Sequence, residues 1–171
     1  MVNSIIAIFL GYLLGSILPA YFLSRWIKDI DIRKIGTGNA GTTNVIKTIG
    51  IIPAIPTAIY DVSKSILAII IARQIFHTSS IIAYLSGFAA ILGHIFPFYI
   101  GFRGGQGAAS ATGLLLYNLY QLFFISKSQL VILDLLLLIL TIVIMIIISH
   151  IQELIAITVL PLFGFFLIYR L

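Results

Sequence analysis

Residues 128–148 read SQLVILDLLLLILTIVIMIII, and Asp134 is the only charged side chain among them. A helix that crosses a bilayer needs about 20 predominantly apolar residues. Inside hydrocarbon every backbone polar group must be hydrogen-bonded within the protein, so a spanning segment is a helix or a strand of a closed barrel. Because this run is apolar throughout and lacks the alternation of a barrel strand, it predicts a membrane-spanning helix.

The whole composition agrees with this prediction. The chain has 171 residues, of which 61% are hydrophobic and 9% are charged, with a mean hydropathy of +1.19. A soluble domain carries roughly 25% charged residues. The absence of cysteine removes disulfides, thiolate nucleophiles and cysteine-ligated metals. The net charge of +5 is expected of a membrane protein with basic loops, so no nucleic-acid partner is predicted.

Further apolar runs surround the first one. We predict spans over residues 4–23, 63–76, 80–100, 108–125, 130–148 and 154–168. Residues 50–60 are also apolar but too short to cross alone, and they contain Pro53 and Pro56. This stretch predicts a re-entrant element or half-helix. The expected fold is therefore an all-α polytopic helical bundle of about six spans plus one half-helix, forming a single domain over residues 1–171.

Basic residues indicate the orientation. Half of the ten Lys and Arg residues follow the first apolar run within a short stretch: Arg25, Lys28, Arg33, Lys34 and Lys47. The positive-inside rule places this loop in the cytoplasm. Counting spans from there places residues 101–107 on the same side of the membrane.

The first polar motif is DIRKIGTGNAGTTNVIK, residues 31–47, which we call the first glycine segment. Gly36, Gly38 and Gly41 permit positive φ, and exposed N–H groups there can form an anion-binding nest. A helix that starts near Thr42 would add its positive N-terminus. Neutral donors and cations also gather here: Thr37, Asn39, Thr42, Thr43, Asn44, Arg33, Lys34 and Lys47. The pattern indicates either a phosphate cradle or an ordinary polar loop. Its GxGxxG spacing follows no predicted strand, so dinucleotide binding is excluded.

The second polar motif comprises GHIFP at residues 93–97 and GFRGGQG at residues 101–107; we call the latter the second glycine segment. It is rich in backbone donors and leads into a predicted helix. Two such segments on one face suggest a substrate with two phosphates or two phosphorylated substrates. His94 could be a base, a donor or a histidine satisfied at a helix end.

Asp61 and Lys64 form the third polar motif. At i and i+3 they share one helix face and could pair. Ionisable residues inside a membrane are costly and are functional candidates by default. The alternative is an internal ion pair that orients residues 50–60.

Together these residues resemble a known family. The ordered stretches are GSILPAY at 15–21, residues 31–44, Asp61 with Lys64, residues 93–97 and FRGGQG at 102–107. They resemble the motifs of the bacterial acyl-phosphate:glycerol-3-phosphate acyltransferase family (PlsY), over roughly the first two thirds of the chain. The resemblance implies acyl transfer from acyl phosphate to the 1-hydroxyl of glycerol 3-phosphate, giving lysophosphatidic acid in phospholipid biosynthesis.

The resemblance also implies partners, location and site residues. The substrates would be acyl phosphate and glycerol 3-phosphate, with membrane lipid around a multi-pass protein of the bacterial cytoplasmic (inner) membrane whose active site faces the cytoplasm. No cofactor or metal is implied. The implied catalytic residues are His94, Asp61 and Asn39, and the general base is left open between His94, Asp61 and the substrate's own phosphate. The implied phosphate-binding residues are Arg33, Gly36, Thr37, Gly38, Gly41, Thr42, Thr43, Asn44, Lys47, Lys64, Arg103, Gly104, Gly105, Gln106 and Gly107.

Several positions diverge from the family pattern. Arg103 stands where the family has Lys, and Gln106 replaces a second Lys. The sequence given ends at Leu171 without the family's polar, basic C-terminal motif. Weaker phosphate binding is expected from both changes. The alternative function is therefore a catalytically degenerate homologue that binds a phosphorylated lipid or a partner protein. A transporter would predict inverted repeats, which the sequence does not contain.

Overall fold

The computed structural model describes residues 1–120, and every regular element in this range is helical. The predicted all-α class is thereby confirmed. The elements are α1 (Val2–Ser16), α2 (Pro19–Lys28), the 3₁₀ turn η1 (Ile32–Lys34), α3 (Thr42–Thr48), α4 (Ile51–Gln74), α5 (Ser80–Ile95), the 3₁₀ turn η2 (Phe98–Ile100) and α6 (Ala108–Tyr120).

Three segments of the described chain are long and apolar enough to cross a membrane: Val2–Lys28, Ile51–Gln74 and Ser80–Ile100. The spans predicted at 130–148 and 154–168 lie outside the described residues, as does the end of the one predicted at 108–125. Met1–Leu115 form one compact unit, and the second begins at Leu116. Of the second unit only the final turn of α6 is described. The single domain and the count of six spans stay predictions.

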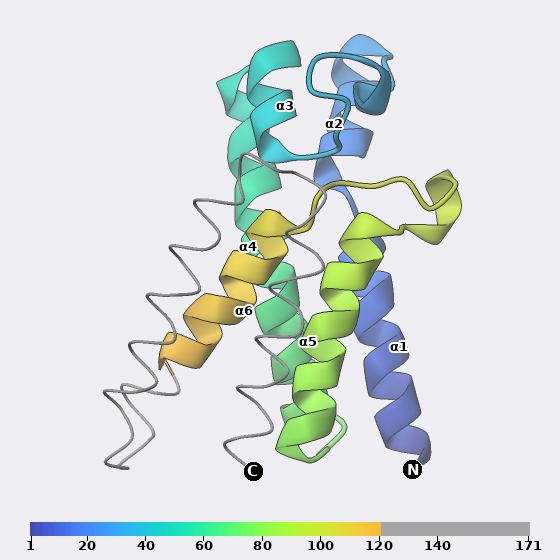
Figure 1. Cartoon of the computed structure of the whole chain (residues 1–171), viewed down its shortest axis with the longest axis vertical. Helices are drawn as coiled ribbons and strands as arrows, with labels where there is room; N and C mark the ends of the chain where they lie inside the picture. The colour runs from blue at the N-terminus through green and yellow to red at the C-terminus, as the bar shows by residue number, and fades with distance from the viewer. Residues whose placement is uncertain (121–171) are drawn as a thin grey trace. The chain divides into compact units, whose positions relative to one another are not determined.

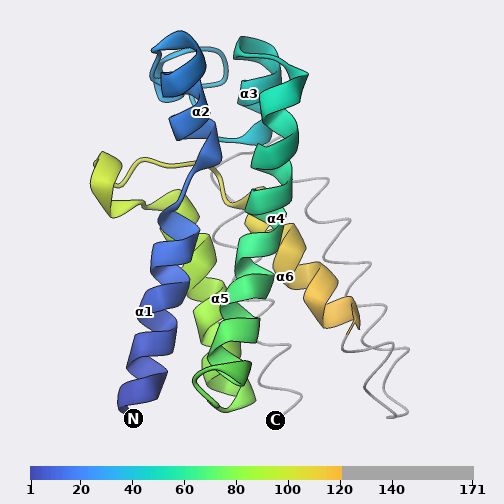
Figure 2. The same cartoon turned by 180° about the vertical axis from the view of Figure 1, so that it is seen from behind.

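Within the first unit, α1, α4 and α5 lie side by side, with α1 and α5 running opposite to α4 (Figures 1 and 2). The N-terminus and the turn between α4 and α5 lie at one end of these helices. At the other end lie α2, η1 and α3 (Figure 1). A small apolar core joins the elements of that end: Leu18, Ala20, Ile32, Ala40, Val45 and Ala54.

Small residues set how closely α1 and α5 approach. A Cβ added at Gly15 would collide with the backbone carbonyl of Ala90, and one added at Gly11 would collide with that of Ser86. Gly93 in turn faces the carbonyl of Tyr12. Such small residues let membrane helices pack backbone to backbone. The spacing of Gly11 and Gly15 is the sequence signal for this contact, which was not among the features that predicted the spans.

The apolar run predicted as a single span at 4–23 is broken. Ile17 and Leu18 are extended, and Pro19 opens α2. The physical reason is Pro19, because proline forces the preceding residue out of the helical region and fits the first position of a new helix.

The break leaves carbonyls without helical partners, and side chains from other elements supply the donors. Lys64 Nζ donates to the oxygens of Gly15 and Ile17 at 3.1 and 3.4 Å. The Tyr99 hydroxyl donates to Ser16 O at 2.8 Å. Backbone carbonyls buried away from water must find such partners, so the break is an integral part of the fold.

The half-helix predicted over residues 50–60 is wrong, because these residues form the first turns of the continuous helix α4. Pro53 lies in the first turn, where an N–H has no helical acceptor and its loss costs nothing. Pro56 is the one proline inside the helix. The hydroxyl of Thr57 donates to Pro53 O at 2.8 Å, within the turn that contains Pro56.

Candidate active site

The first glycine segment begins with a capped turn. The Asp31 carboxylate accepts the Arg33 N–H at 3.1 Å and starts η1. Gly36 and Gly38 then have φ of +64° and +76°, where side chains are disfavoured. Gly41 has φ of −143° with open space at its Cβ position. The positive φ expected at Gly41 is therefore wrong, because the chain is extended where it enters α3.

Asn44 holds the first glycine segment closed from inside. Its amide nitrogen lies 2.8 Å from Ile32 O, 2.9 Å from Ile35 O and 2.9 Å from Asn39 O. Its amide oxygen accepts the Thr37 N–H at 2.9 Å. The residue is buried. Its polar groups are thus engaged within the protein, in contrast to the phosphate contact expected from the sequence.

Arg33 joins the two glycine segments. Its Nε and Nη2 donate to the two Asp31 carboxylate oxygens at 2.9 and 2.7 Å. Its Nη1 donates to Ile100 O at 2.6 Å and Arg103 O at 3.0 Å. The hydrogen bond from Arg33 lowers the pKa of Asp31, and Asp31 in turn raises the pKa of Arg33. Arg33 therefore acts as a cross-link rather than as an open phosphate ligand.

The second glycine segment folds back onto the end of α5. Gly104 N–H donates to Ile95 O at 2.9 Å, and Gly105 N–H donates to His94 O at 3.1 Å. These bonds satisfy carbonyls that the last turn of a helix leaves free. The sequence predicted that the backbone of Gly104 and Gly105 would bind phosphate, whereas here both N–H groups are used inside the protein.

The two glycine segments meet at Gly105. A Cβ added at Gly105 would collide with His94 Nε2 and would lie 2.8 Å from Ala40 O. Glycine is required there because backbone from one segment and the histidine ring occupy the space of a side chain. Together with the bonds from Arg33, this contact confirms that both segments lie at the same end of the helices. We call this place the loop junction.

Beneath the loop junction lies a buried ionic cluster of Asp61, Lys64 and His94, which are 1%, 0% and 3% exposed. Lys64 Nζ donates to Asp61 Oδ1 at 2.9 Å and lies 2.5 Å from His94 Nδ1. Asp61 Oδ1 is 3.4 Å from His94 Nδ1. The pairing of Asp61 with Lys64, one of the alternatives drawn from their spacing, is confirmed. The Lys64 ammonium is thus surrounded by acceptors of the protein itself.

Other predicted site residues face outward. Thr37, Thr43, Lys47, Arg103 and Gln106 are exposed, as is Gly38, and Asn39 is half-buried. The Thr42 hydroxyl is buried and, among the described residues, has no hydrogen-bond partner. Gly107 has φ of +81° at the start of α6. The open donors and cations at this end are therefore fewer than the sequence suggested.

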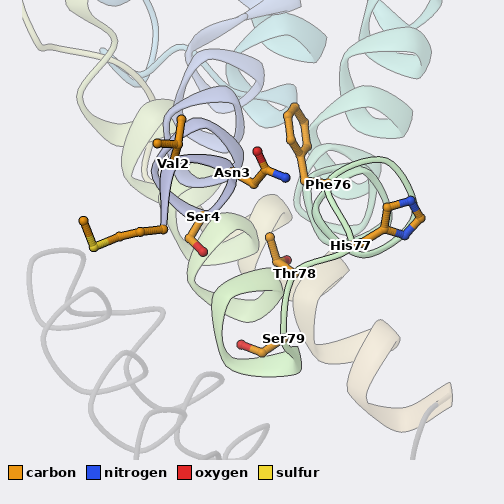
Figure 3. A pocket seen from close by; sticks show the side chains of 8 residues that line it. Val2, Asn3, Ser4, Phe76, His77, Thr78 and Ser79 are labelled. Carbon is orange, nitrogen blue, oxygen red and sulfur yellow. The ribbon is translucent and has the colours of Figure 1, made fainter.

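A cavity of about 560 Å³ lies at the opposite end of the first unit (Figure 3). It is lined by Met1, Val2, Asn3, Ser4, Phe76, His77, Thr78 and Ser79. None of the site residues predicted from the sequence contributes to it, so it is separate from the loop junction.

The described helices and the loop junction define an integral membrane protein of the all-α class with a polar site at one end of its helices. A family model for glycerol-3-phosphate acyltransferase matches residues 5–171. The chain therefore belongs to the glycerol-3-phosphate acyltransferase family.

Individual relatives agree with this assignment. The glycerol-3-phosphate acyltransferase of Shouchella clausii is 36% identical over 99% of this chain and 83% of its own length. That of Synechococcus elongatus is 45% identical over 68% of this chain, and the match spans 59% of its own length. The chain thus covers less than two thirds of that relative.

Solved structures agree as well. The crystal structure of PlsY (YgiH), an integral membrane glycerol 3-phosphate acyltransferase, in its glycerol 3-phosphate form has a TM-score of 0.64 and 25% identity, covering 98% of this chain and 77% of that one. Its lysophosphatidic acid form has a TM-score of 0.60 and 27% identity, covering 95% and 86%.

Proposed function

We propose that this protein transfers an acyl group from an acyl phosphate to the 1-hydroxyl of glycerol 3-phosphate, releasing lysophosphatidic acid and inorganic phosphate. The relatives and solved structures that it resembles are named glycerol-3-phosphate acyltransferases, a name that gives the acceptor and the group transferred; the acyl-phosphate donor is part of the proposal. The observation that carries the proposal is the loop junction, where Arg103 on the second glycine segment is bonded through its backbone to Arg33 of the first. Two anionic substrates need cations from both segments at one place.

Binding of the phosphates falls to the groups that remain open. Lys47 and Arg103 are exposed cations, and Thr37, Thr43 and Gln106 are exposed neutral donors. Arg103 offers a planar fork that matches a phosphate in two places. Three further polar residues hold the backbone around these groups in place: Arg33, Asn44 and Lys64. The donors of these three side chains are engaged within the protein.

The reaction asks little acid–base chemistry of the protein. The glycerol 3-phosphate hydroxyl oxygen forms a bond to the acyl carbon, and the bond from that carbon to the phosphate oxygen breaks. The leaving phosphate has a second pKa of about 6, so it can depart as an anion and take up the hydroxyl proton. Positioning two bound substrates can supply roughly 7–11 kcal/mol, and each donor aimed at the developing oxyanion about 3–4 kcal/mol.

We also propose that the protein lies in the bacterial inner membrane with the loop junction facing the cytoplasm. The exposed basic residues Arg25, Lys28, Lys34 and Lys47 gather at the end that holds the junction. Basic residues in short loops favour the cytoplasmic side. Acyl phosphate and glycerol 3-phosphate would then reach the site from that side.

The test is turnover by purified protein in detergent micelles or nanodiscs. A long-chain acyl phosphate and labelled glycerol 3-phosphate should give labelled lysophosphatidic acid, whereas the matching acyl-CoA should not. Arg103→Ala should lower kcat/KM for glycerol 3-phosphate by about 100-fold, since a charged hydrogen bond contributes about 1.5–3 kcal/mol. Arg73→Ala, at the far end of α4, is the matched control and should leave turnover unchanged.

A folded preparation without turnover would refute the proposed activity. If that preparation still bound glycerol 3-phosphate, the non-catalytic binding alternative would replace it. Equal use of the acyl-CoA would refute the choice of acyl donor alone.

A further inference from the structure

The histidine of the buried ionic cluster has two ring nitrogens in different surroundings. Nδ1 lies 2.5 Å from Lys64 Nζ. Nε2 lies at the loop junction, against Gly105. Which nitrogen carries the proton decides whether the ring can accept a proton or donate a hydrogen bond there.

The neighbours of Lys64 identify the donor in the contact with His94. An ammonium has three protons and accepts none. Around Nζ lie one carboxylate oxygen of Asp61 and the backbone oxygens of Gly15 and Ile17. All three are acceptors, and Asp61 supplies the negative charge that stabilises the ammonium. The contact with Ile17 O is the longest, at 3.4 Å, so the three protons are directed to Asp61, Gly15 and His94. Lys64 therefore donates to His94, and Nδ1 must be the unprotonated, accepting nitrogen.

The alternative arrangement would place the ring proton on Nδ1 and direct it to Asp61 Oδ1, 3.4 Å away. That contact is longer than a good hydrogen bond, and it would turn an N–H toward the Lys64 ammonium at much closer range. A doubly protonated ring would also place a second positive charge beside Lys64 in a buried site. The Lys64 ammonium therefore disfavours both the ring protonated at Nδ1 and the doubly protonated ring.

We propose that Lys64 is a positioning residue that holds His94 in the tautomer protonated at Nε2, so that the ring presents a hydrogen-bond donor, and not a base, at the loop junction. The polar contacts given for the ring are made by Nδ1, whereas Nε2 faces Gly105 at the loop junction, and the proposal assigns its proton to a ligand bound there. The identity of the ligand rests on the proposed function: the group that accepts this proton is an oxygen of the acyl phosphate. Asp61 acts one step further back by holding Lys64.

The first experiment measures the tautomer directly and needs no substrate. In protein with ¹⁵N-labelled histidine at neutral pH, His94 should show a pyrrole-type signal for Nε2 and a pyridine-type signal for Nδ1. The His94 signals are assigned by their loss in His94→Gln. A wild-type signal protonated at Nδ1, or at both nitrogens, would overturn the proposal.

The role of Lys64 is tested by moving the proton. In Lys64→Met the nearest remaining partner of Nδ1 is the acceptor Asp61 Oδ1, so the ring proton should shift to Nδ1. Lys34→Met, which removes an exposed lysine, is the matched control and should leave the tautomer as in wild type. An unchanged tautomer in folded Lys64→Met would refute the role of Lys64. If that variant does not fold, the wild-type spectrum still decides the tautomer.

The second experiment separates a donor from a base by turnover. Gln places an N–H near the position of Nε2 but cannot act as a base. His94→Gln should therefore retain kcat within about tenfold of wild type, while His94→Ala should lose about 100-fold or more. Equal losses in both variants would indicate a base and overturn the proposal. An inactive wild-type protein with the Nε2–H tautomer would refute the proposed function alone.

Discussion

At the residue scale, identical residue types in the first glycine segment have different roles. Asn44 and Asn39 are five positions apart, yet Asn44 makes four hydrogen bonds inside the segment. Within residues 1–120, the Asn39 side chain donates one long bond, of 3.4 Å, to Thr37 O. The sequence assigned both to the site because both are donors in a glycine-rich motif. It could not separate them, since the difference depends on which side of the loop each side chain faces.

Asp31 gives a residue-scale prediction about pH. Its pKa is lowered in the folded protein by the hydrogen bond from Arg33. A carboxylate with a lowered folded pKa stabilises the fold above its unfolded pKa of about 4, and this contribution is lost as the pH falls through the folded value. We expect Asp31→Asn to reduce the free energy of unfolding by about 1–2 kcal/mol at neutral pH.

The measurement is unfolding in detergent at a series of pH values. The wild type should lose its advantage over Asp31→Asn as the pH falls below about 4, so the two curves should converge in acid. Asp29→Asn is the control, because Asp29 is 97% exposed and its contact with Arg25 is 3.8 Å long. Parallel curves for wild type and Asp31→Asn would contradict the prediction.

At the element scale, the approach of α1 to α5 depends on Gly15. Its missing Cβ is replaced by the backbone carbonyl of Ala90, which cannot rotate away as a side chain would. We expect Gly15→Ala to lower the free energy of unfolding by about 3 kcal/mol, because a methyl group forced into a packed contact strains both helices. Reversible unfolding in mixed micelles would measure this change.

Gly41→Ala is the matched control. Gly41 has an ordinary extended φ and open space around its Cβ position, so the same change should alter stability by less than about 0.5 kcal/mol. Equal stability of Gly15→Ala and Gly41→Ala would mean that α1 and α5 do not pack as closely as described.

The elements differ in how far they could be predicted. Hydropathy alone located α5 and the second half of α4 as spans, because continuous apolar runs have few other solutions in a chain this poor in charge. It missed the interruption at Ile17 and Leu18. Pro19 marks the break in the sequence, but the donors that satisfy the freed carbonyls come from Lys64 and Tyr99, which are distant in the sequence. It also separated residues 50–60, which contain Pro53 and Pro56, from the rest of α4. The cost of a proline depends on its position within the helix. Periodicity does not locate the start of a helix to within one residue, so that position could not be predicted.

At the scale of the whole molecule, the end of the helices at which each glycine segment lies was predictable from the sequence. The contacts between the two segments were not. Counting spans placed both glycine segments on one face, and the bonds of Arg33 to Ile100 and Arg103 confirm that they meet. The buried ionic cluster beneath them joins Asp61 and Lys64 of α4 to His94 of α5, and Lys64 also donates to Gly15 O of α1. Only Asp61 and Lys64 share an element, so their spacing was the only part of that cluster visible in the sequence.

The orientation in the membrane gives the last prediction, and the lack of cysteine makes it direct to test. Lys34 is exposed at the end that holds the loop junction, and Ser79 is exposed in the turn between α4 and α5 at the other end. With the basic end inside, a membrane-impermeant maleimide applied to spheroplasts should label Ser79→Cys at once. Lys34→Cys should react only after the membrane is opened, and the unmodified chain should not react at all. The reverse pattern would place the junction outside, where no cytoplasmic acyl phosphate could reach it.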